Sequence, residues 1–213
     1  MAENATNVMF MGGDSESEPN IVQERVIEKA TRLFASLGYD GTPAQTIADA
    51  AGLDIATVTD LVGGKREIYM TVMRRSHLAT QAMLDSALAE FTPDRAGVLL
   101  VVDRFLDFHI DHPEIPELWI HRWMSDAADI TGVEALYLKP NRDRINDAFR
   151  GVVGSNMDLD VNLEVIVWCI RGFVVGGMLS PKGEPHGPRD TVYLQRFRAH
   201  LHQLVTRMLR LDG

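Results

Sequence analysis

The chain has 213 residues, of which 46% are hydrophobic and 24% charged, and its formal net charge is −9. This composition is typical of a soluble globular protein that needs neither a metal ion nor a disulfide to fold. A single cysteine, Cys169, excludes an intrachain disulfide and a four-cysteine zinc site. The net charge has the wrong sign for a protein that coats nucleic acid, although a local DNA-binding patch is compatible with it.

Residues 1–19 contain four acidic residues and no basic one, so we expect a disordered N-terminal arm. No basic segment followed by an apolar run precedes the remainder of the chain, which argues against a secretory signal. The longest apolar stretch, residues 163–179, contains Glu164 and Arg171 and falls short of a membrane span. The sequence therefore predicts a cytoplasmic protein with no membrane association.

Helical periodicity begins at residue 20 with an apolar stripe of Val26, Ile27, Ala30, Leu33, Phe34 and Leu37. Gly38 should end this helix. We then expect short helices over 44–51, capped by Thr42, and 55–62, capped by Asp54, and a long helix from Lys65 to about residue 91. Further helices are predicted over 94–111, 114–129, 132–151, 159–180 and 189–211. No alternating strand pattern is visible, so the fold class is all-α with about nine helices.

The strongest motif is a short helix, a glycine turn and a second short helix over residues 46–58. Ile47 and Ala48 should face inward, Gly52 should make the turn, and Leu53 and Val58 should fill the angle between the two helices. This pattern is typical of a helix-turn-helix, whose second helix can enter the DNA major groove. A purely structural helical corner is the alternative interpretation.

The motif's surroundings sharpen this interpretation. The segments Arg25–Phe34, Gly38–Thr42 and Lys65–Ile68 flank it at fixed spacing. Residues 21–70 thereby closely resemble the DNA-binding domain of the tetracycline-repressor (TetR) family of transcriptional regulators. The resemblance implies a homodimer that binds a palindromic operator, usually as a repressor, and that a small ligand releases. The implied domains are a DNA-binding domain at 20–68 and a ligand-binding and dimerisation domain at 69–213.

The resemblance also implies the DNA-contacting positions, which are Thr42, Gln45, Ile55, Thr57, Thr59 and Lys65. Gln45 can pair with adenine and Ile55 can pack on a thymine methyl group. Thr57 and Lys65 can hold phosphates.

Two features depart from the family pattern. Thr59 replaces the usual tyrosine, and the acidic Asp60 follows it. Residues 20–72 contain five basic and seven acidic residues, a local net charge of 5 − 7 = −2. Because phosphate neutralisation supplies most non-specific DNA affinity, we expect weak non-specific binding. A helical ligand-binding or protein-interaction module with a degenerate DNA-binding head is therefore the alternative function.

The C-terminal part is rich in aromatic residues, and we expect an apolar cavity that binds a small hydrophobic effector. Its predicted lining is Phe105, Phe108, His109, Trp119 and Trp123. His109 is the expected polar anchor, since an imidazole can donate or accept a hydrogen bond. The tryptophans could instead be core residues, and His109 with His112 could hold a metal ion, although we expect no metal or cofactor.

Two helices carry the predicted dimer interface. Gly172 and Gly176 lie on one face of the helix over 159–180 and would allow a partner helix to approach closely. An apolar stripe on the last helix completes the predicted set, which comprises Leu194, Phe197, Leu201, Leu204 and Met208. A buried core helix is the alternative interpretation of that stripe. No phosphate loop, nucleophile elbow or paired catalytic carboxylates are visible, so we do not expect an enzyme.

Overall fold

The computed structural model describes residues 18–154 and 156–211. Ten helices and one two-stranded hairpin make up this part of the chain, which confirms the all-α class. In chain order the elements are α1 (Glu18–Leu37), α2 (Ala44–Ala51), α3 (Ile55–Val62), α4 (Lys65–Ala89), α5 (Arg95–Asp111), α6 (Glu114–Trp123), α7 (Val133–Tyr137), α8 (Lys139–Phe149), α9 (Leu159–Gly176), β1 (Met178–Leu179), β2 (Pro185–His186) and α10 (Thr191–Met208). The predicted disordered arm lies outside the described residues up to residue 17, and its last two residues already belong to α1.

Two predicted helices are shorter than expected. The helix predicted over 114–129 ends at Trp123, because Ser125 and Ala127 adopt positive φ angles of 68° and 53°. The helix predicted over 132–151 is divided into α7 and α8 near Pro140, whose ring nitrogen cannot donate a helical hydrogen bond. A third helix, predicted over 159–180, ends at Gly176. A hairpin follows Gly177 where the sequence predicted the end of that helix and then a gap, with Met178 opposite His186 in antiparallel register.

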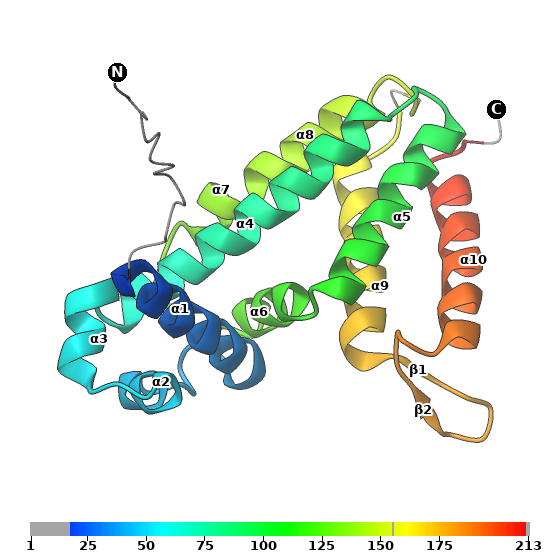
Figure 1. Ribbon diagram of the computed structural model, residues 1–213. Helices are drawn as coiled ribbons and strands as arrows, with labels where there is room; N and C mark the ends of the chain where they lie inside the picture. The colour runs from blue at the N-terminus through cyan, green and yellow to red at the C-terminus, as the bar shows by residue number, and fades with distance from the viewer. Residues whose placement is uncertain (1–17, 155, 212–213) are drawn as a thin grey trace, which may run out of the picture.

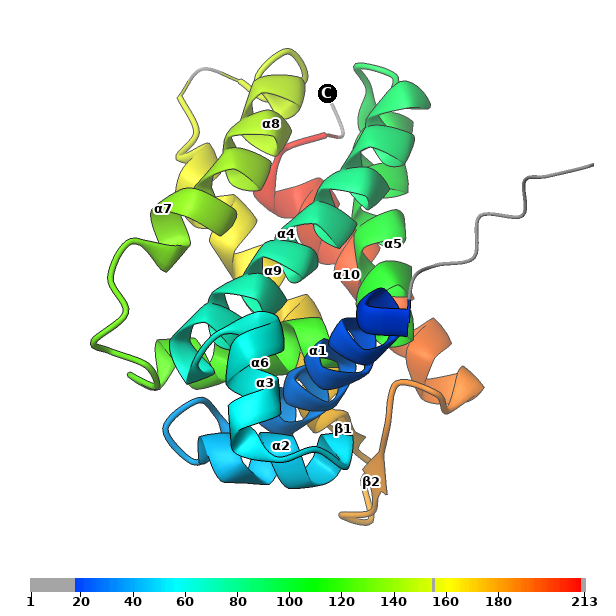
Figure 2. The ribbon, with the colours of Figure 1, turned by 60° about the vertical axis from the view of Figure 1, so that its left-hand side comes forward.

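The helices form two regions that α4 connects (Figure 1). We call α1–α3 the head and α5–α10 the body. In the head, α1 packs against α2, α3 and the beginning of α4. In the body, α9 packs against α5, α6 and α10, while α8 lies along α4 (Figure 2). The predicted domain boundary after residue 68 falls inside α4, so no break in the chain marks it.

Two hydrophobic clusters form the core. The first contains Phe34, Ile47, Val58 and Tyr69 of the head and α4, and it continues into α6 through Leu118 and Trp119. The second occupies the body and combines buried residues of α4, α5, α8, α9 and α10. Because α6 contributes to the first cluster, the head rests on a piece of the body rather than being an isolated module.

The loop after α6 attaches the body to the end of α1. The carboxylate of Asp126 accepts hydrogen bonds from the backbone N–H groups of Tyr39 and Asp40, at 2.7 and 2.8 Å. His121 Nε2 donates to the carbonyl oxygen of Ala35 at 2.9 Å. Gly38, with φ at 75°, is required here, since a Cβ would lie 2.9 Å from an Asp126 oxygen.

Candidate nucleic-acid interface and internal cavity

Residues 44–62 form the predicted helix-turn-helix. Gly52 adopts the left-handed conformation (φ 69°), and the Leu53 N–H donates to the carbonyl oxygen of Ala48 at 3.0 Å. Asp54 caps α3 by accepting from the backbone N–H of Thr57 at 2.8 Å. Ile47 and Val58 are buried, so the inner faces of both helices pack into the head core. The turn, the Asp54 cap and the buried face agree with the sequence prediction.

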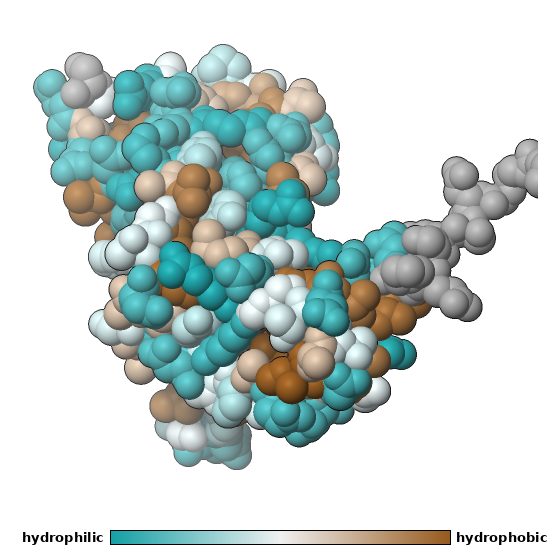
Figure 3. Space-filling view, turned by 90° about the vertical axis from the view of Figure 1, so that its left-hand side faces the viewer, coloured by the Kyte–Doolittle hydropathy of each residue, from teal (hydrophilic) through white to brown (hydrophobic). Residues whose placement is uncertain are grey.

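The outer face of α3 is exposed. Ile55 keeps 40% of its surface accessible, and Thr59 and Asp60 are also exposed. Gln45 of α2 is exposed beside this face, and its amide donates to Asp49 Oδ1 at 2.7 Å. Figure 3 shows the molecule from the side of the head, where hydrophobic and hydrophilic residues alternate over the surface. The exposed side chains here are therefore mixed, with an apolar group at Ile55, an amide at Gln45 and carboxylates at Asp49 and Asp60.

All three predicted DNA-contacting threonines donate their hydroxyl hydrogen bonds within the chain. Thr42 is fully buried and its hydroxyl donates to the carbonyl oxygen of Gly38 at 2.6 Å. It therefore neither caps α2, as predicted, nor reaches the surface, because the tight connection between α1 and α2 folds over it. The Thr57 hydroxyl donates to Asp54 Oδ2 at 2.7 Å. Thr59 is exposed, and its hydroxyl donates to the Ile55 carbonyl oxygen at 2.8 Å.

Lys65 begins α4 at the edge of the head. Its ammonium nitrogen lies 4.1 Å from the centroid of the Tyr39 ring, a cation–π contact that holds the side chain on the head surface. Asp54 stays charged, since hydrogen bonds from Thr57 lower the pKa of its carboxyl below the usual value. The face thus combines one fixed cation with the carboxylates of Asp49, Asp54 and Asp60.

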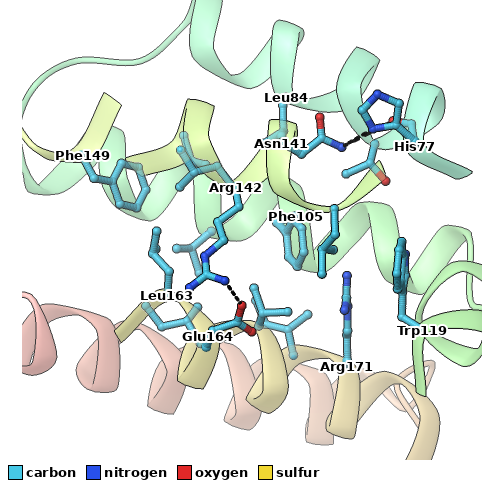
Figure 4. Close-up of a pocket in the computed structure, with 18 of the residues that line it drawn as sticks. His77, Leu84, Phe105, Trp119, Asn141, Arg142, Phe149, Leu163, Glu164 and Arg171 are labelled. Carbon is cyan, nitrogen blue, oxygen red and sulfur yellow. Dashed lines mark hydrogen bonds and ion pairs between the residues drawn. The ribbon is translucent and has the colours of Figure 1, made fainter. Parts of the chain in front are cut away.

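A cavity of about 80 Å³ lies inside the body between α4, α5, α6, α8 and α9 (Figure 4). Its wall is mainly aliphatic and aromatic, with Leu84, Val102, Phe105 and Ile166 among the lining residues. The polar side chains of the wall were not predicted as site residues, and they are His77, Thr80, Asn141, Arg142, Glu164 and Arg171. At one end, Asn141 Nδ2 lies 3.2 Å from His77 Nδ1, which in turn donates to the Tyr137 carbonyl oxygen.

The predicted ligand-binding residues are only partly brought together. Phe105 and Trp119 line the cavity, whereas Phe108, His109 and Trp123 do not. His109 is fully buried between Phe105 and Phe108, and its Nδ1 donates to the Phe105 carbonyl oxygen at 2.8 Å.

Burial and the positive charge of Arg171 lower the pKa of His109 to about 3, so the ring is neutral. His109 is not among the residues that line the cavity, since its ring packs against Phe105, and its role as a ligand anchor stays an untested prediction.

Arg171 was not predicted as a site residue, yet it is the most deeply buried of the charged side chains in the cavity wall. It lies on α9 with 4% of its surface exposed, and its Nε and Nη1 atoms are buried without a hydrogen-bond partner. Burial lowers its pKa to about 10, so the guanidinium remains charged at neutral pH. The available signal was a single arginine within the apolar stretch of residues 163–179.

The predicted interface residues divide into two sets. A Cβ on Gly172 or Gly176 would meet open space, so both glycines lie on a free face of α9. Leu201 is 2% exposed and Phe197 stacks on Phe173 with ring centroids 4.0 Å apart.

Leu194, Leu204 and Met208 are also partly covered. Leu201 is covered by α5 and α9 of its own chain, and Leu194 and Phe197 pack against the same cluster. Leu204 and Met208 are half-buried, and the contribution of this stripe to a dimer stays a prediction.

Trp168 is the exposed neighbour of these glycines. It keeps 56% of its surface accessible, as does Val161 about two helical turns earlier on α9, and Val175 keeps 43%. These residues and the two glycines form a stripe that we call the α9 face. Beyond the exposed Val192 near its start, the exposed face of α10 is mainly polar, with Gln195, Arg196, His200 and Gln203.

Within residues 18–154 and 156–211, no group of three or more histidine, cysteine or acidic side chains could hold a metal ion. His112 lies at the surface, 3.4 Å from Glu114, whereas His109 is buried, so the two histidines do not converge. None of the helices in this part of the chain is long and apolar enough to cross a bilayer.

No protein-family model matches the chain. A curated relative, the HTH-type transcriptional repressor SCO4008 of Streptomyces coelicolor, is 29% identical over 101 residues. That match covers 47% of this chain and 49% of the relative, so the similarity spans about half of each protein.

Solved structures resemble the chain over most of its length. The TetR family transcriptional regulator PfmR from Thermus thermophilus has a TM-score of 0.62 at 18% identity, covering 87% of this chain and 95% of its own. The fatty acid degradation regulator FadR from Bacillus halodurans has a TM-score of 0.67 at 12% identity, covering 89% and 97%. A TetR-like transcriptional regulator from a Rhodococcus species has a TM-score of 0.64 at 16% identity, covering 89% and 96%. The chain therefore has the fold of the TetR-family transcriptional regulators, as the sequence resemblance predicted.

Proposed function

We propose that this chain is a ligand-responsive transcriptional repressor that acts in the cytoplasm and binds a palindromic operator as a homodimer. The observation that carries the proposal is the helix-turn-helix of residues 44–62, whose inner face is buried and whose outer face is exposed. A recognition helix must have this arrangement to enter a major groove while it stays fixed to its domain. The curated relative that resembles part of the chain is named a transcriptional repressor.

Base reading is assigned to Gln45 and Ile55, and phosphate binding to Lys65. The amide of Gln45 has to exchange its hydrogen bond with Asp49 for one with a base edge, which is possible because both side chains are exposed. Lys65 is held by the Tyr39 ring at the edge of the head, where the sugar-phosphate backbone of the bound DNA would pass. Thr57 is kept as a capping partner of Asp54, so we assign it a positioning role.

Dimerisation is assigned to the α9 face. Val161, Trp168 and Val175 are large apolar residues whose side chains are exposed to solvent, and Gly172 and Gly176 leave room for a partner helix. Trp168→Glu should therefore produce monomers in size-exclusion chromatography with light scattering, while Gln203→Glu on the polar face of α10 should not. An unchanged dimer with Trp168→Glu would place the interface elsewhere.

Ligand control is assigned to the cavity. At about 80 Å³ the cavity is small, so an effector larger than a few heavy atoms must push its walls apart. Two of those walls lead to the head. The helix α4 lines the cavity through His77, Thr80 and Leu84 and begins at Lys65. The helix α6 lines it through Trp119 and is hydrogen-bonded to the end of α1 through His121.

Widening the cavity would therefore move both supports of the head. A ligand that binds the widened form more tightly shifts the population toward it, and the two heads of a dimer then no longer match their half-sites.

Selection of bound duplexes from a random DNA pool tests the proposed function. We expect recovery of an inverted repeat whose half-sites lie one helical turn apart or a multiple of it. Recovery of no preferred sequence would favour the alternative function, a helical module with a degenerate head, for which the exposed carboxylates of Asp49 and Asp60 are the supporting observation.

A further inference from the structure

Among residues 18–154 and 156–211, the buried guanidinium of Arg171 makes no direct ion pair with a carboxylate. Its Nε and Nη1 atoms are enclosed and unpaired, and 4% of the residue's surface is accessible. A buried charge without a partner is costly, and removing the charge or supplying a counter-ion relieves that cost. A residue of this kind in a helix that is otherwise apolar indicates that an anion from outside completes the site.

The nearest carboxylate is already paired with another arginine. Glu164 lies seven residues, about two helical turns, before Arg171 on α9, and its charge acts on Arg171 only from a distance. Its Oε1 atom is 2.8 Å from Arg142 Nη1, and this ion pair lies in the cavity wall. His109 is neutral, and its unpaired Nε2 atom carries no negative charge.

The strongest contacts of Arg171 are therefore aromatic. Its guanidinium carbon is 4.9 Å from the centroid of Trp123 and 6.0 Å from that of Trp119. Such contacts contribute less than a desolvated ion pair would, but they hold the guanidinium plane in place.

Figure 4 shows where the guanidinium points. Arg171 rises from α9 into the space between Phe105 and Trp119, while Leu163 and Phe149 lie at the opposite end of the cavity. One end of the cavity is thus cationic and the remainder is largely aliphatic and aromatic. A ligand that satisfies both ends has one anionic group and an apolar body.

We propose that the cavity binds a small carboxylic acid with an apolar body, and that Arg171 pairs with its carboxylate. This inference rests on the proposed function, since it names the chemistry of the effector of the same cavity. A planar guanidinium fork matches a carboxylate with two parallel hydrogen bonds. A doubly charged phosphate is disfavoured, because the cavity offers one unpaired cation and the carboxylate of Glu164 lies in the same wall.

Octanoate and 1-octanol, which share a chain length and differ in the head group, provide the test. Binding to the full-length chain is measured without DNA, by tryptophan fluorescence and by the rise in melting temperature with ligand concentration. We expect octanoate to bind roughly 10–100-fold more tightly than 1-octanol, the gain expected from one charge-assisted pair. Octyl phosphate should bind more weakly than octanoate.

Arg171→Met should remove the preference for octanoate over 1-octanol, whereas Arg171→Lys should keep a reduced preference because the charge remains. The matched control is Arg104→Met, which removes an exposed arginine that pairs with Glu90 outside the cavity. This control should keep the full preference. If Arg171→Met does not fold, the inference is still tested by comparing the binding of octanoate and 1-octanol to the native chain and to Arg171→Lys.

Equal binding of octanoate and 1-octanol to the native chain would overturn the inference, as would an undiminished preference in Arg171→Met. Two further outcomes distinguish a failure of the proposed function from a failure of this inference. If octanoate binds through Arg171 but DNA affinity does not change, ligand control is wrong and the ligand class stands. If an uncharged compound binds in the cavity and releases DNA, ligand control stands and the carboxylate is wrong.

Discussion

The head and the body keep their charged side chains in different places. In the head, Arg32, Asp49 and Asp60 all lie at the surface, while the aromatic ring of Phe34 is fully buried in the core of α1–α3. In the body, the guanidinium of Arg171 lies inside, next to a cavity. The shape of the head thus depends on apolar packing, so its exposed side chains are free to vary without loss of the fold. The body gives up stability to bury a charge, which is expected of a ligand site and not of a scaffold.

The largest expected effect concerns the packing of the head. Phe34 is fully buried and contacts Tyr39 and Tyr69 at centroid distances of 5.9 and 5.4 Å. Phe34→Ala should lower the free energy of unfolding by about 3–5 kcal/mol, measured by urea denaturation. Leu37→Ala on the same helix, at a side chain that is 51% exposed, is the control and should change it by less than about 1 kcal/mol. A small loss for Phe34→Ala would mean that packing does not determine the head.

The loop that joins the body to the head should be the next most sensitive point. Arg122 donates to the carbonyl oxygens of Ala127 and Ile130 and forms an ion pair with Glu134 at 2.6 Å. Arg122→Met should cost about 1.5–3 kcal/mol of unfolding free energy, because buried carbonyl groups lose a charged donor. Glu134→Gln should cost less, since Glu134 is about half exposed. Hydrogen exchange at Tyr39 and Asp40 should also accelerate in Arg122→Met, and unchanged exchange there would separate this loop from the head.

Arg171→Met in the body should have the opposite effect on stability from the substitutions in the head. Because it replaces an unpaired buried charge by an apolar side chain of similar length, we expect the free energy of unfolding to rise by about 1 kcal/mol or more. Denaturation in the absence of ligand measures it. A decrease of several kcal/mol would show that Arg171 is a structural residue whose partners stabilise the body.

The smallest effect is the dependence of stability on pH at the cap of α3. The pKa of Asp54 is lowered in the folded chain by hydrogen bonds from Thr57. Its contribution is therefore present above the unfolded pKa of about 4 and is lost as pH falls through the lower folded value. Asp54→Asn keeps the capping acceptor but does not titrate, so its stability should fall less between about pH 5 and pH 3 than that of the native chain. Identical pH profiles would exclude this role.

Local patterns predicted most helices, the Gly38 and Gly52 turns and the Asp54 cap, because each depends on residues close together in the sequence. The end of α6 was missed, since the loop that follows it is held by Asp126 across more than 80 residues of chain. Apolar periodicity indicated a buried stripe on α10 but not its partner. That partner proved to be α5 and α9 of the same chain.

The cavity, too, could be predicted only in part from local sequence patterns. Phe105 and Trp119 were predicted from composition, but the burial of Arg171 depends on α6 folding back over α9, which no local pattern contains.

The central claim, that the outer face of α2 and α3 reads DNA, is tested most directly by fluorescence anisotropy with two variants on the selected duplex and on its single-base substitutions. Gln45→Ala should lose about 1–3 kcal/mol of discrimination at one base pair and little elsewhere. Lys65→Ala should weaken all duplexes alike, because a phosphate contact carries no base information. If both variants bind every duplex as tightly as the native chain does, this face is not the DNA interface and the account is contradicted.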